Sequence, residues 1–92
     1  MIRHIVLIKT QNLERLTQAL ELVKVLVGKV EGLESIEIAK DFSGRSKDFD
    51  HLFVMNFIEE RYLNNWSQHP EHTAIRDILK SIAEMIVFDY KV

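Results

Sequence analysis

The sequence predicts a single α+β domain with the element order βαββαβ, in which a four-stranded antiparallel sheet carries helices on one face. The chain has 92 residues, which is the size of one domain. Four segments rich in β-branched and aromatic residues alternate with segments of helical periodicity. The two middle strand segments are separated by a short polar turn, which is typical of an antiparallel hairpin.

Composition and charge exclude several classes of protein. The chain is 47% hydrophobic and 28% charged, as in ordinary globular domains. Its 12 basic and 14 acidic residues give a net charge of −2, which argues against nucleic acid as a partner because phosphate binding needs a concentrated positive surface. Because cysteine is absent, disulfides, Cys-ligated zinc and thiol nucleophiles are excluded. Without a recognisable targeting signal or membrane span, we expect a cytoplasmic protein that binds no membrane.

The first strand is predicted over residues 2–9, where apolar side chains occur at both parities. Asn12 then provides a good N-cap for a helix. From Leu13 to Val30, apolar residues recur at spacings of three and four, which predicts a helix packed on the sheet. Gly28 and Gly32 bracket the expected end of this helix.

The second half of the chain supplies the hairpin and the remaining elements. Strands are predicted over 33–41 and 49–58, with a polar turn between them. A short helix follows over 59–68. Pro70 interrupts it and can serve as the first residue of another helix. The closing strand is predicted over 84–91.

The first, third and last strands are apolar on both sides, although helices can cover only one face of the sheet. An uncovered second face would expose an apolar patch that is uncommon on soluble monomers. Packing of two sheets face to face in a homodimer would bury this patch. The alternative is a monomer whose second face is a ligand groove. If Ile5 and Leu7 pack beneath the helices, His4 points away from them, into the space between two sheets.

Four segments give the chain a resemblance to a known family. They stand in the order seen in stress-responsive dimeric α/β-barrel (Dabb) domains, and the similarity covers essentially the whole of 1–92: MIRHIVLIK at 1–9, FDH at 49–51, HPEH at 69–72 and VFDY at 87–90. The resemblance implies a single ferredoxin-like domain. It also implies that its sheet pairs with that of a second copy into a dimeric α/β barrel that encloses a cavity.

The family resemblance also suggests chemistry. Dabb proteins include stress-linked plant proteins, some relatives are cofactor-free polyketide cyclases, and the wider superfamily includes monooxygenases and haem-degrading enzymes. In the cyclase type, the second His of the HPxH motif works with a Tyr six residues earlier, and the matching positions here are His72 and Trp66. An indole cannot donate and recover a phenolic proton. The family's His on the first strand, the His of its FDH motif and the Asp on its last strand match His4, His51 and Asp89.

Three residues are candidates for catalysis. His72 stands third in the helix that begins at Pro70, and a neutral imidazole there could abstract a proton α to a carbonyl. The alternative is a histidine that anchors the helix to the sheet. His4 needs a polar partner among its apolar neighbours, and Asp89 on the adjacent strand is the natural one. This pair could fix a tautomer for chemistry, or simply satisfy two buried polar groups.

Four residues are candidates for ligand binding. Trp66, Tyr62 and Phe57 could line a pocket for a flat apolar molecule, although aromatic residues at such positions also fit an ordinary core. His51 lies near the end of a buried strand face, where a core or interface role is the alternative.

No cofactor or metal is expected. The sequence contains no P-loop, dinucleotide-binding glycine motif or nucleophile elbow. His69, His72 and Glu71 lack the further nearby ligand that a zinc site needs.

The sequence therefore favours a homodimer that binds a small apolar or aromatic molecule in the barrel cavity. Because Trp66 stands where the cyclase type has its Tyr, the sequence favours ligand binding over catalytic turnover. Two alternatives stay open: a cofactor-free cyclase-like or monooxygenase-like enzyme that uses His72 as a base, and a structural stress protein whose dimer is itself the function.

Overall fold

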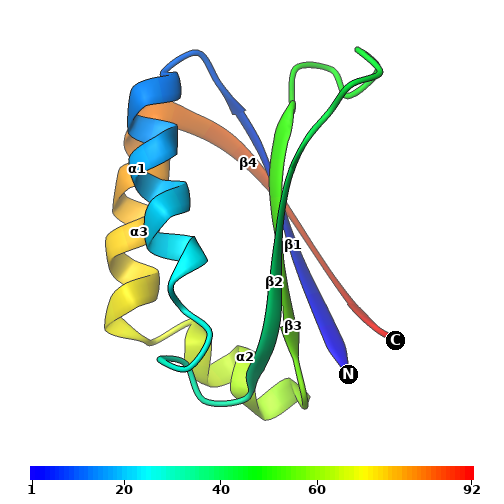
Figure 1. Cartoon of the computed structure of the whole chain (residues 1–92), viewed down its shortest axis with the longest axis vertical. Coiled ribbons are helices and arrows are strands. Elements are labelled where there is room, and N and C mark those ends of the chain that lie inside the picture. Colours follow the sequence, from blue (N-terminus) through cyan, green and yellow to red (C-terminus); the bar gives the residue numbers. More distant parts are fainter.

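The computed structural model describes residues 1–92 and confirms the predicted architecture (Figure 1). The sheet has the strand order β2-β3-β1-β4, and all neighbouring strands are antiparallel. The two long helices, α1 and α3, lie side by side on one face of the sheet, and the other face is uncovered. The elements are β1 (Ile2–Thr10), α1 (Leu13–Lys24), β2 (Leu33–Lys40), β3 (His51–Phe57), α2 (Glu60–Trp66), α3 (Pro70–Ile82) and β4 (Ala83–Lys91).

The central strand β1 shows which face of the sheet the helices cover. Val6 and Ile8 are buried on the helix side, with 5% and 0% of their surface exposed. Ile5 and Leu7 point to the opposite face, so the expectation that they pack beneath the helices is wrong. His4 shares the parity of Val6 and therefore faces the helices, not the space between two sheets. Both parities of this strand are apolar, so its hydrophobic pattern alone could not select the face.

Helix α1 ends at Lys24, six residues before the predicted end at Val30. Turns follow the helix, and Gly28 adopts a positive φ of 91°. Leu26 and Val30 are still buried, and the Val30 N–H donates to the Leu26 carbonyl at 3.1 Å. The apolar periodicity thus predicts correctly that Leu26 and Val30 are buried, although they lie in turns and not in a helix.

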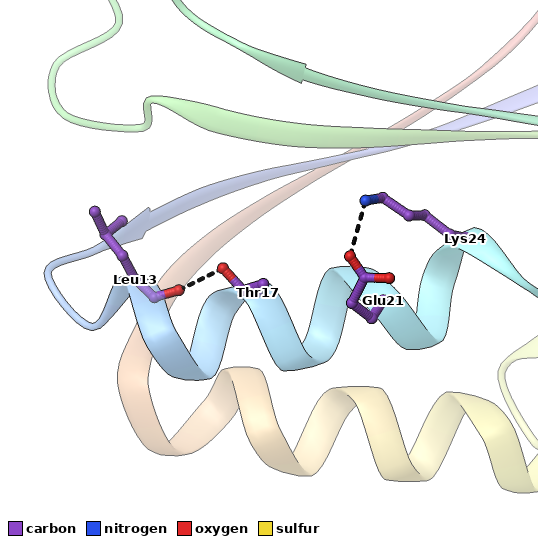
Figure 2. A network of polar contacts seen from close by, with 4 residues as sticks. All are labelled: Leu13, Thr17, Glu21 and Lys24. Atoms are coloured by element: carbon purple, nitrogen blue, oxygen red, sulfur yellow. Dashed lines mark hydrogen bonds and ion pairs between the residues drawn. The ribbon is translucent and has the colours of Figure 1, made fainter.

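The start and the outer side of α1 are held by local polar contacts. The Asn12 side chain caps the helix by accepting from the Arg15 N–H at 3.1 Å, as predicted. Figure 2 shows the Thr17 hydroxyl donating to the Leu13 carbonyl at 2.8 Å and the Lys24 ammonium 2.9 Å from Glu21. These side chains are exposed, whereas the opposite side of the helix buries Leu16, Ala19 and Val23.

A close contact positions α2 against the loop before β2. Gly32 has a φ of +78°, and a Cβ placed on it would lie 2.0 Å from Cγ of Tyr62. The Gly32 carbonyl also accepts from the Ile58 N–H at 2.9 Å. Only glycine fits this backbone conformation and this space. The contact fixes the helix whose last residue is Trp66.

Helix α3 begins at Pro70, as predicted, and ends at Ile82. The His69 side chain caps it, because Nδ1 accepts from the Glu71 N–H at 3.0 Å. The helix buries two of its own residues, Ile75 and Leu79, on the side that faces the core. None of the helices has both the length and the apolar character needed to cross a membrane.

Candidate functional site

An apolar cavity of about 260 Å³ lies between α3 and the helix-facing side of the sheet. Strands β1, β3 and β4 supply one wall, and α3 with the end of α2 supplies the other. Its apolar lining consists of Val6, Phe53, Trp66, Ile75, Leu79, Met85 and Val87. The polar side chains that line it are His4, His72, Arg76 and Lys80. All of these lining residues come from one chain, and the cavity is partly open to solvent.

His72 is the third residue of α3, and its side chain lines the cavity. Its ring stands edge-on to that of Trp66, with a centroid distance of 5.2 Å and an interplanar angle of 76°. Its Nδ1 atom is buried and has no hydrogen-bond partner. A buried polar atom without a partner is uncommon in native proteins.

The surroundings of His72 favour its neutral form. Burial lowers the pKa of the imidazole, and electrostatic repulsion from Arg76 and from the His4 ring lowers it further, against the smaller opposing effect of a hydrogen bond with the Ser67 backbone. The position of the ring in the first turn of α3 acts in the same direction, because the helix dipole disfavours a cation there. A neutral imidazole can accept a proton, so His72 has the protonation state that a general base requires.

His4 and Asp89 form the pair that the sequence suggested. They lie opposite each other on β1 and β4, and His4 Nδ1 is 2.5 Å from Asp89 Oδ1. The His4 side chain is 12% exposed and that of Asp89 is 44% exposed. A carboxylate on Nδ1 favours the tautomer that carries its proton there, which leaves Nε2 as an acceptor in the neutral ring.

Trp66 forms an apolar wall of the cavity. It is 3% exposed and ends α2, and its ring also lies 5.7 Å from that of His69. The two histidines of the HPEH segment thus both pack on this indole. Its position is set jointly by α2, by the break at Pro70 and by the start of α3.

Three of the predicted ligand-binding residues lie elsewhere. Phe57 is completely buried in the core, and the Tyr62 ring packs against Gly32 while its hydroxyl accepts from Arg61 at 2.8 Å. His51 begins β3, paired with Ile8. None of the three lines the cavity. Side-chain direction accounts for Tyr62: it lies one turn before Trp66 on α2, but it points to the loop before β2.

Two charged lining residues were missed by the sequence reasoning, as were the apolar lining residues other than Trp66. Arg76 and Lys80 follow His72 at intervals of four, so the three side chains form one row along α3. This spacing was visible in the sequence. It could not be distinguished from a solvated helix side until the structure showed which side of α3 borders the cavity.

Known structures share this fold over nearly the whole chain. A dimeric ferredoxin-like protein of unknown function from Jannaschia sp. CCS1 has 20% identity and a TM-score of 0.88, with 99% of this chain and 98% of that chain covered. A protein from Arabidopsis thaliana has 20% identity and a TM-score of 0.86, with 100% and 95% covered. A Dabb family protein with a ferredoxin-like fold from Mesorhizobium loti has 22% identity and a TM-score of 0.80, with 99% and 95% covered. At such identities, the likeness shows the fold.

The family assignment comes from the sequence itself. No curated protein matches the chain. The sequence profile described as "Stress responsive A/B Barrel Domain", abbreviated Dabb, matches residues 2–92. The match spans both strands of the His4–Asp89 pair and the whole HPEH segment. The chain belongs to the stress responsive A/B barrel (Dabb) domain family.

Proposed function

We propose that this protein is a homodimer in which each protomer binds a small apolar or aromatic molecule in the cavity between the sheet and α3. The observation that carries the proposal is the cavity itself, whose apolar wall is accompanied by four basic side chains, His4, His72, Arg76 and Lys80. Apolar lining with a few convergent polar groups is the usual character of a small-molecule site. A volume of about 260 Å³ suits a body of one or two rings.

The dimer is supported by the uncovered face of the sheet. Two apolar rows run across the three strands β3, β1 and β4 on this face, as the strand register shows: Val54–Ile5–Phe88 and Leu52–Leu7–Ile86. Phe88 is 60% exposed and Ile86 is 46% exposed. An apolar surface of this kind is typical of an interface core.

A polar row bounds this apolar face toward one end. The Arg3 side chain donates to the Asn56 side-chain oxygen at 3.2 Å and to the Tyr90 hydroxyl at 2.7 Å. An apolar centre with a polar rim is the arrangement of a protein interface, and a two-fold axis would place the same patch of a second copy on it. The Jannaschia protein is described as dimeric, which agrees with a second copy of the chain as the partner of this face.

Binding is tested by isothermal titration calorimetry with two aromatic probes of the same size, 2-naphthoate and 2-naphthamide. We expect saturable binding of at least one probe at one site per protomer. The Trp66 indole N–H resonance should shift on binding, because this residue is the only tryptophan and lines the cavity. If neither probe binds and the resonance does not move, ligand binding at this site is refuted, and the dimer as the function itself becomes the better explanation.

A second candidate function is proton abstraction from a carbon acid, favoured by the position of His72 in the cavity lining and by its lowered pKa. Here His72 would take a proton α to a carbonyl, and His4 in its imidazolium form, paired with Asp89 through Nδ1, would donate its Nε2–H to the carbonyl oxygen. Trp66 has no hydroxyl, so the step relies on the histidines alone. The test is deuterium exchange at the α-carbon of a β-diketone probe. Wild-type protein should accelerate the exchange and H72Q should not; equal rates for both would eliminate this function.

A further inference from the structure

The charged groups that surround the cavity are all of one sign. Its ionisable lining residues are His4, His72, Arg76 and Lys80, and no Asp or Glu lines it. His4 already has a carboxylate partner in Asp89. This local excess of basic groups does not reflect the whole chain, which carries a net charge of −2. The cavity is therefore apolar inside and basic along the α3 side.

Arg76 and Lys80 are available to bind an anion. The only acidic contact of Arg76 is Asp77 at 3.6 Å, and both of these side chains are about half exposed or more, at 47% and 66%. Such an exposed contact contributes little. Lys80 makes no ion pair. Neither cation is therefore committed to a structural role.

Their place on α3 directs these cations toward a ligand in the cavity. Ile75 and Leu79, the residues that immediately precede them, are buried at 3% and 2% exposure and form the apolar wall. Arg76 and Lys80 themselves are exposed, although both border the same space. The cationic groups thus stand between the apolar interior and solvent, one helical turn apart.

We propose that Arg76 and Lys80 form an anion-binding subsite, and that the ligand is an amphipathic acid with an apolar body in the cavity and a carboxylate at the α3 side. The proposal rests on the proposed function, because it assumes that the cavity binds a small molecule. A planar guanidinium matches the two oxygens of a carboxylate, and the ammonium one turn away adds a second charge-assisted contact. An apolar body that excludes water from one side strengthens both contacts.

The test compares 2-naphthoate with its neutral analogue 2-naphthamide by calorimetry at about pH 8, where naphthoate is ionised. We expect wild-type protein to bind naphthoate roughly tenfold more tightly than the amide. In the R76Q/K80Q variant, the preference for naphthoate over the amide should be lost, because the affinity for naphthoate should fall much more than the affinity for the amide. Raising the salt concentration should reduce the preference of wild-type protein for the acid, because partly exposed charges are screened.

K29Q is the matched control, because Lys29 is an exposed lysine in the turns after α1 and does not line the cavity. It should retain the preference for naphthoate. Equal binding of both probes by wild-type protein would overturn the anion subsite and leave the binding function standing. Persistence of the preference in R76Q/K80Q would also overturn it, since the anion would then be held elsewhere. Failure of both probes to bind would refute the proposed function, and the subsite with it.

Discussion

His4 Nδ1 lies 2.5 Å from Asp89 Oδ1 across the β1–β4 ladder, on the helix-facing side of the sheet. β4 is an edge strand, bonded only to β1. The contact therefore joins a cavity-lining histidine to a strand that backbone pairing holds on one side only. The orientation of the His4 ring in the cavity therefore depends on the pairing of β4 with β1.

This pairing predicts a measurable coupling between the two side chains. We expect H4A and D89A each to lower the free energy of unfolding, and their double-mutant cycle to give a coupling of about 1 kcal/mol, since Asp89 is partly exposed and its carboxylate can be hydrated when His4 is absent. Urea unfolding of wild type, both single variants and the double variant supplies the four values. Strict additivity of the two single changes would show that the contact contributes nothing to stability.

His72 predicts a pH dependence of stability. Its pKa is lowered from 6.5 in the folded chain by burial and by electrostatic repulsion from Arg76 and His4, so the unfolded chain binds the proton more readily. The stabilising effect is complete above 6.5 and is lost as the pH falls toward the lower folded value. H72Q should therefore lose less stability than wild type between about pH 7.5 and about pH 5.5. Urea unfolding at both pH values measures this, and parallel losses in the two proteins would contradict it.

Substitutions at two neighbouring residues of β1 are expected to have different effects, one on folding and the other on association. Val6 faces the helices and is 5% exposed, whereas Leu7 belongs to the uncovered face. V6D should cost roughly 3–5 kcal/mol by placing an unpaired carboxylate in the core, and should prevent folding. L7D should leave the chain folded but prevent formation of the proposed dimer. Circular dichroism and sedimentation velocity distinguish these outcomes. A folded V6D protein would disprove the face assignment, and a dimeric L7D protein would disprove the interface.

Alanine substitutions at Gly28 and Gly32 distinguish two costs: that of a positive φ in a non-glycine residue and that of a steric clash with Tyr62. Both have positive φ, but a Cβ at Gly28 would meet nothing within 4 Å, whereas one at Gly32 would lie 2.0 Å from Tyr62 Cγ. G28A should cost about 1 kcal/mol for the backbone conformation alone, and G32A roughly 2–4 kcal/mol because packing strain is added. Thermal unfolding gives both values. Equal costs would mean that Tyr62 moves aside without penalty.

Four features could be predicted from the amino-acid sequence: the element order, the helix cap at Asn12, the start of α3 at Pro70 and the His4–Asp89 pairing. These features depend on local chemistry or on strand order. A cap needs one side chain near one amide, a proline tolerates only certain helix positions, and two adjacent strands bring their residues into register. Such requirements can be inferred along the chain without knowledge of packing.

The tertiary structure alone decided which face of the sheet the helices cover, and with it the location of the cavity. In β1 the apolar residues Ile5 and Val6 fit either face equally well, so only their packing against α1 and α3 could choose between them. The same applies to Arg76 and Lys80, whose spacing is also that of an ordinary solvated helix side. Only the rotation of α3 about its axis, set by the burial of Ile75 and Leu79, placed those cations at the edge of the cavity.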